Sequence, residues 1–233
     1  MKIEREAYLL AGPTASGKSA IAAELADEMG AWILSADSML VYRGMDIGTA
    51  KPSKAERERF HMGGVDLVTP AEEFSSGAWL RATYDWFHQV PAETPIIIVG
   101  GTGLYFSALL RGLDRAWTLP PPEYPVIAID REVVRARIAE RLDDMFISGL
   151  EAEKLKLHAE YPVWSRTAAL AIGYREGDDK EKIRIRTCQL AKRQDTWFRH
   201  QATPIYVEPT VEAVRKCWRE RGPWKVSVVK NEE

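Results

Sequence analysis

The chain has 233 residues, of which 45% are hydrophobic and 28% charged, and its formal net charge at pH 7 is −2. These values are ordinary for a folded globular protein and exclude a disordered chain or a uniformly basic nucleic-acid binder, although one basic face stays compatible with them. Two cysteines, Cys188 and Cys217, occur without a CxxC or Cys/His cluster, so neither a disulfide framework nor a zinc site is expected. No apolar stretch approaches ~18 residues, so we expect a cytoplasmic protein without a membrane span.

Apolar runs and helical spacings alternate along the first part of the chain. Short apolar runs predict strands at 8–11, 31–36, 95–99 and 125–129. Apolar residues at helical spacing predict helices at 17–29, 53–60, 75–90 and 103–113. Alternation of this kind is typical of an α/β fold with a mostly parallel sheet flanked by helices, and the continuous apolar strands indicate burial on both faces.

The pattern becomes more helical after Asp130. Amphipathic patterns predict helices at 131–148, 150–160, 180–201 and 211–221, with a last strand at 205–207. Residues 114–124, which contain three consecutive prolines, read as a linker-like segment. We therefore expect a single domain in three parts: an αβ core at 1–130, a helical portion at 131–201, and a C-terminal strand and helix at 202–233.

Residues 12–19 read GPTASGKS and match the pattern G-x-x-x-x-G-K-[ST]. Because a predicted strand precedes this loop and a helix follows it, its backbone N–H groups would surround phosphate oxygens at a helix N-terminus. Lys18 would place a cation on the phosphates, and the Ser19 hydroxyl would bind Mg²⁺, the expected metal cofactor. The motif predicts a P-loop NTPase-like fold and a di- or triphosphate ligand, without identifying that ligand. The predicted binding residues are Gly12, Pro13, Thr14, Ala15, Ser16, Gly17, Lys18 and Ser19.

Asp37 follows the second predicted strand. Ligands of open parallel sheets bind at the carboxyl ends of the strands, so we expect Asp37 to face the same cleft as the P-loop. A carboxylate there can take a proton from an attacking amine or hydroxyl. The alternative is a residue that closes an Asx turn or caps the following loop. The strand at 95–99 ends in Gly100-Gly101 rather than in a metal-holding aspartate, which argues against a motor-type NTPase.

The predicted helix at 180–201 is strongly basic. Residues 180–199 contain seven Lys or Arg and two Asp or Glu. Such a helix could follow the phosphates of a nucleic-acid backbone, or it could simply present a solvated charged face.

Five segments in order resemble the tRNA dimethylallyltransferases, also called tRNA isopentenyltransferases. They are GPTASGKS at 12–19, SADSMLVYRGMDIGTAKPS at 35–53, VGGTGLYFSALLRG at 99–112, IGYRE at 172–176 and AKRQDTWFRHQ at 191–201. The resemblance implies that the P-loop holds the diphosphate of dimethylallyl diphosphate. It also implies that the acceptor is the exocyclic amine of the tRNA adenosine just 3′ of the anticodon.

The resemblance further assigns roles to residues. Asp37 matches the family's general base, Thr102 matches a position near the reacting base, and Arg175 looks like an arginine that helps to hold the diphosphate; these are the candidate catalytic residues. The protein would bind the anticodon arm of tRNA and act as a monomer. The candidate tRNA-binding residues are Asp37, Ser38, Met39, Leu40, Thr102, Lys192 and Arg193.

The chain departs from this family in one respect. Typical bacterial members carry an inserted helical subdomain after the segment corresponding to 109–113, whereas only residues 114–124 separate that segment from the next strand here. The insertion is therefore expected to be absent, which weakens the expected grip on tRNA. The alternatives are dimethylallyl transfer to a free adenine nucleotide, a P-loop nucleotide kinase, and an inactive RNA-binding module.

Overall fold

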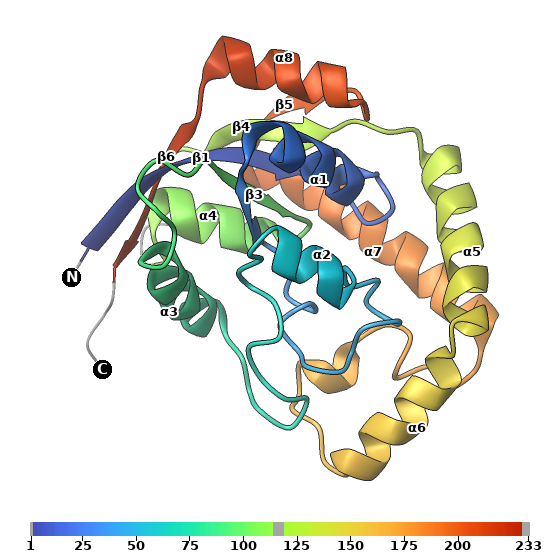
Figure 1. The fold of residues 1–233 in the computed structure, drawn as a ribbon. Helices are drawn as coiled ribbons and strands as arrows, with labels where there is room; N and C mark the ends of the chain where they lie inside the picture. The colour runs from blue at the N-terminus through green and yellow to red at the C-terminus, as the bar shows by residue number, and fades with distance from the viewer. Residues whose placement is uncertain (1, 114–118, 230–233) are drawn as a thin grey trace.

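The computed structural model describes residues 2–113 and 119–229. Within these residues one six-stranded sheet runs through the molecule, in the order β2-β3-β1-β4-β5, with β6 paired to β1 (Figure 1). Neighbours along the main path pair in parallel, and only β6 is antiparallel. The predicted α/β fold with a mostly parallel sheet is confirmed. The strands are β1 (Lys2–Ala11), β2 (Trp32–Ser35), β3 (Ile96–Gly100), β4 (Glu123–Ile127), β5 (Thr203–Val207) and β6 (Trp224–Val229).

Helices cover both faces of this sheet. Alternate strand residues point to opposite sides: Leu10 and Ile97 pack against α1 and α8, whereas Leu9 and Ile98 belong to the core formed with α3, α4 and α7. The helices are α1 (Lys18–Met29), α2 (Lys54–Arg59), α3 (Ser76–Phe87), α4 (Gly103–Arg111), α5 (Arg131–Ile147), α6 (Leu150–Glu160), α7 (Lys180–Gln201) and α8 (Val211–Arg221), with a 3₁₀ turn at Ala168–Leu170. Among the described residues, none of these helices is long and apolar enough to cross a membrane.

The predicted elements all occur, and three details were wrong. The bounds of α6, α7 and α8 match the prediction, and apart from the start of β1 the other ends shift by at most three residues. β1 begins at Lys2 rather than at residue 8, because its first half pairs with β6, a strand that was not predicted. The strand predicted at 125–129 lies two residues earlier, at β4. The predicted linker therefore ends before Glu123, and its residues 114–118 lie outside the described part of the chain.

Candidate active site

The P-loop connects β1 to α1 at the carboxyl edge of the sheet. Ala15 and Gly17 adopt left-handed backbone angles, with φ of 60° and 90°, which curl the loop before the helix begins. Gly17 is the N-cap of α1 and makes no side-chain cap, so the first N–H groups of the helix remain available to a ligand. Successive N–H groups in such a curl form a concave anion-binding site at the positive end of the helix dipole.

Lys18 carries the buried cation of this site. The residue is 9% exposed, and its Nζ donates to the carbonyl of Pro13 at 3.1 Å. Burial lowers the pKa of Lys18 to about 8, an effect that Asp37 opposes and Arg141 reinforces. Lys18, Asp37 and Arg141 line one cavity of about 360 Å³. An ammonium held there with a carbonyl partner is prepared for an anionic ligand that would replace its lost hydration.

Asp37 closes an Asx turn and also borders the cavity of the P-loop. Its Oδ1 accepts a hydrogen bond from the N–H of Met39 at 2.9 Å, which closes an Asx turn. The same side chain also borders both the Lys18 cavity and a second, larger cavity of about 540 Å³, called here the main cavity. Thr102 fixes this turn, because its Oγ1 accepts from the N–H of Ser38 at 3.0 Å and its own N–H donates to Ala36 at 3.0 Å.

The main cavity brings most of the predicted residues together. Thr14, Asp37, Thr102, Arg175 and Arg193 all line it. Ser38 and Met39 line it as well, whereas Leu40 lies on the Lys18 cavity instead. One wall is apolar and comes from α5, the 3₁₀ turn and α7: Ile138, Leu142, Met145, Leu170, Ile183 and Leu190.

Arg175 reaches the main cavity but not the Lys18 cavity. Its Nε donates to Glu176 Oε1 at 2.6 Å, and the Glu176 side chain is buried. Glu176 also accepts from Gly173 N–H at 2.8 Å and pairs with Arg186 at 3.2 Å. Arg175 is therefore held by a carboxylate anchor, with the rest of its guanidinium available to the cavity.

Two residues of the site were missed from the sequence. Arg141 of α5 lines both cavities and donates from Nη2 to Thr14 Oγ1 at 2.9 Å, and burial lowers its pKa. Gln194 of α7 accepts from Thr14 N–H at 2.8 Å and donates to Gly101 O at 3.0 Å, so it ties the P-loop to the loop after β3. Arg141 lies between the buried Ile138 and Leu142, a spacing that could have marked it as inward-facing.

The glycines after β3 serve close packing. A Cβ at Gly103 would lie 2.0 Å from the ring of Trp197, and a Cβ at Gly101 would lie 2.3 Å from Gln194. Their absence of side chains lets α7 lie directly against the start of α4. This close approach places Gln194 on the P-loop.

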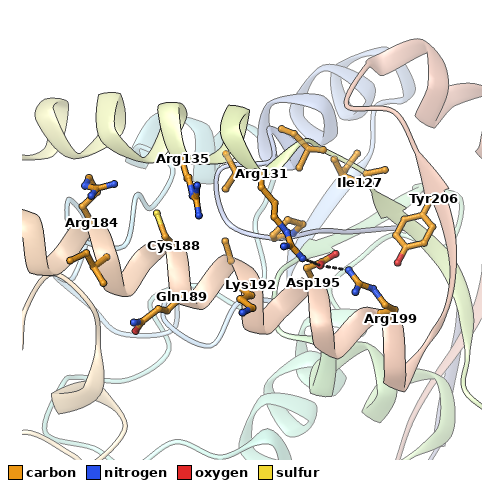
Figure 2. A pocket seen from close by; sticks show the side chains of 16 residues that line it. Ile127, Arg131, Arg135, Arg184, Cys188, Gln189, Lys192, Asp195, Arg199 and Tyr206 are labelled. Carbon is orange, nitrogen blue, oxygen red and sulfur yellow. Dashed lines mark hydrogen bonds and ion pairs between the residues drawn. The ribbon is translucent and has the colours of Figure 1, made fainter.

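The predicted RNA-binding pair Lys192 and Arg193 is divided between two faces of α7. Arg193 lines the main cavity. Lys192 lines a separate groove of about 870 Å³ between α5 and α7 (Figure 2). This groove is larger than the main cavity, but neither Lys18 nor Asp37 lines it. The candidate active site is therefore formed by the main cavity and the Lys18 cavity.

The residues around Lys18 fit a magnesium ion that a bound diphosphate helps to hold. The exposed hydroxyl of Ser19 and the Asp37 carboxylate line the Lys18 cavity and offer the oxygen ligands that Mg²⁺ prefers. No cluster of three or more His, Cys, Asp or Glu suited to a metal occurs in the described parts of the chain.

Comparisons with known proteins give matches over most of the chain. The family model of the IPP transferases matches residues 40–125 and 118–201, and that of the isopentenyl transferases matches residues 5–62. The tRNA dimethylallyltransferase of Nautilia profundicola is 32% identical over 267 positions, which cover 83% of this chain and 92% of that protein. That of Bdellovibrio bacteriovorus is 36% identical over 185 positions, which cover 78% of this chain and 54% of that protein.

Solved structures share the fold. A tRNA delta(2)-isopentenylpyrophosphate transferase of Staphylococcus epidermidis superposes with a TM-score of 0.78 at 24% identity, covering 92% of this chain and 98% of that one. A eukaryotic dimethylallyltransferase acting on tRNA gives 0.73 at 18% identity, covering 94% and 76%.

The same comparisons locate a difference from the relatives. The alignment with the Nautilia protein has 267 positions but takes in only 83% of this chain, so that relative carries residues that this chain lacks. The IPP transferase model matches in two segments that overlap at residues 118–125, across the start of β4. The sequence predicted the absence of an inserted subdomain close to this point. The matched segments extend over most of the sheet and the site, and the chain belongs to the tRNA dimethylallyltransferase family.

Proposed function

We propose that this protein transfers the dimethylallyl group of dimethylallyl diphosphate to the exocyclic amine of the tRNA adenosine just 3′ of the anticodon. The observation that carries the proposal is the position of Asp37. Its carboxylate borders both the cavity of the P-loop lysine and the main cavity with an apolar wall. The carboxylate proposed as the general base therefore lies between the anion site on the P-loop and the apolar wall of the main cavity.

The diphosphate would lie on the P-loop. The loop N–H groups, Lys18 and Arg141 converge on the Lys18 cavity and would stabilise the negative charge that grows on the leaving diphosphate. Arg141 is held in place by Thr14, so its guanidinium needs little reorganisation when the ligand arrives. Mg²⁺ bound beside Ser19 would add a Lewis acid that further neutralises the diphosphate oxygens.

The five-carbon group would extend into the main cavity. Its apolar wall on α5 and α7, which includes Leu142 and Leu190, would exclude water from the allylic carbon as positive charge develops there. The acceptor adenine must leave its stack to enter, at a cost of a few kcal/mol.

Asp37 would then accept the proton of the amine. The Asx turn fixes Oδ1 on Met39 N–H, and the other carboxylate oxygen has no hydrogen-bond donor among the described residues. That oxygen can accept from the amine while nitrogen attacks the allylic carbon and the carbon–oxygen bond to diphosphate breaks. Thr102, which holds the turn through Ser38, keeps the carboxylate aimed at the cavity.

The test is a transfer assay with labelled dimethylallyl diphosphate and Mg²⁺. Unmodified tRNA and, separately, AMP, ADP and ATP would serve as acceptors for the wild type, Asp37→Asn and Asp130→Asn. Asp130 is the matched control, because it also follows a strand but caps α5 by accepting from Glu132 N–H. Label in tRNA that is lost only in Asp37→Asn supports the proposal. Label in free nucleotides alone, or ATP turnover without transfer, contradicts it.

A further inference from the structure

The groove between α5 and α7 is unused by the mechanism above. It has a volume of about 870 Å³ and is bordered by both helices, by the carboxyl end of β4 at Ile127 and by Tyr206 of β5 (Figure 2). Figure 2 shows Arg131 and Arg135 extending from α5 toward α7. Tyr206, at one end of the groove, is 49% exposed.

Positive charge is concentrated in this groove. Its lining includes the cations Arg131, Arg135, Arg184, Lys192 and Arg199, against the single carboxylate Asp195. The whole chain, by contrast, has a net charge of −2.

Only part of this charge is neutralised. Asp195 pairs with Arg199 at 2.5 Å and lies 4.0 Å from Arg131. Arg135 pairs with Glu132 and Arg184 pairs with Glu181, and both of these exposed carboxylates lie outside the groove lining. Within the described parts of the chain, Lys192 has no ion-pair partner. The excess of cations favours an anionic partner.

Helix α7 is a common wall between the groove and the main cavity. Arg193 and Gln194 face the main cavity, while Lys192 and Asp195 face the groove. Pro13 of the P-loop also borders the groove. An RNA that places one nucleotide in the main cavity therefore brings its neighbouring backbone within reach of this helix.

We infer that this groove binds the phosphate backbone of the acceptor RNA, as a second contact surface that supplements the main cavity; this rests on the proposed function. Arginine and lysine side chains from two helices are the usual ligands of RNA phosphates, and an exposed tyrosine can stack on an unpaired base. Interfaces with nucleic acid are much more positively charged than interfaces between proteins, so a lining with five cations and one carboxylate fits RNA better than a protein partner.

The salt dependence of tRNA binding tests this inference. Arg135→Ala/Lys192→Ala removes two groove cations, and Lys216→Ala/Arg219→Ala removes two exposed cations from α8, which does not line the groove. Fluorescence anisotropy with unmodified tRNA would give Kd between 50 and 300 mM salt, after thermal unfolding has shown that each variant is folded. We expect the groove variant to bind about tenfold more weakly at low salt, with a log–log salt slope shallower by roughly 1.4–1.8, since each phosphate contact contributes about 0.7–0.9.

The control should keep the wild-type Kd and slope. A groove variant that binds like the wild type would overturn the inference and leave the groove to another kind of partner. Equal losses in both variants would also overturn it, because they would indicate a diffuse field rather than a site. The assay needs no catalysis. Intact tRNA binding without dimethylallyl transfer would therefore refute the proposed function while leaving the groove measurement valid.

Discussion

Replacing Lys18 by methionine is expected to stabilise the protein while abolishing its activity. Burial lowers the pKa of Lys18 from 10.5 to about 8, and the residue is only 9% exposed. A lowering of that size corresponds to about 3 kcal/mol against the folded state at pH 7. Methionine keeps most of the apolar stem and removes the charge, so Lys18→Met should raise the free energy of unfolding by about 3 kcal/mol at pH 7.

The stability cost of burying the Lys18 ammonium should depend on pH. Below pH 8 the amine is protonated in both the folded and the unfolded chain, so the folded state bears the whole free-energy cost of burying the charge. Between pH 8 and 10.5 the folded state is neutral while the unfolded state still binds the proton, so the cost falls as pH rises. The gain from Lys18→Met should therefore be about 1.4 kcal/mol smaller at pH 9 than at pH 7.

Urea unfolding at pH 6, 7 and 9 measures these differences. Lys182→Met, at an exposed lysine of α7, is the matched control and should change stability by no more than about 0.5 kcal/mol. Inorganic diphosphate should stabilise the wild type more than Lys18→Met, because the variant keeps only the loop N–H groups and Arg141 as ligands. A loss of stability in Lys18→Met, or a gain that does not change with pH, would refute the view that Lys18 is a desolvated cation awaiting an anion.

Three further predictions follow from the same geometry. The kcat/KM for dimethylallyl diphosphate should fall about tenfold per pH unit above about pH 8, because free enzyme then loses the Lys18 charge, and a flat profile to pH 9.5 would contradict this. Glu153 accepts hydrogen bonds from the N–H groups of residues 46–48 and from the Tyr174 hydroxyl. Glu153→Gln turns one acceptor into a donor, so urea unfolding should show a loss of about 1–3 kcal/mol, and an unchanged midpoint would count against this anchor. Gly103→Ala should cost about 1–3 kcal/mol because its Cβ would lie 2.0 Å from Trp197, and a fully stable, fully active variant would show that α7 need not approach so closely.

The sequence predicted the parts of the site that depend on local pattern. The P-loop follows from glycine spacing between a strand and a helix, and Asp37 follows from its place at a strand end. The helices α6, α7 and α8 were predicted with their observed bounds, and side-chain caps at Asp179 and Thr210 mark the starts of α7 and α8. The division of Lys192 and Arg193 also follows from local geometry, since consecutive helical residues point about 100° apart.

Contacts between distant segments could not be predicted in this way. β6 pairs with the first half of β1 from the other end of the chain, and nothing in either segment alone specifies that partner. Arg141 reaches Thr14 only because α5 packs across α7 and turns one of its many charged residues inward. The role of Gln194 likewise depends on α7 passing directly over the P-loop.

The most direct test of the central claim is a single-turnover reaction of labelled dimethylallyl diphosphate with an unmodified tRNA, followed by location of the labelled nucleoside. The wild type should label the adenosine just 3′ of the anticodon, and Asp37→Asn should do so about 10²–10⁴ times more slowly, the usual contribution of a general base. Label at another position, or an undiminished rate in Asp37→Asn, would contradict the assignment of Asp37 and its cavity as the catalytic centre.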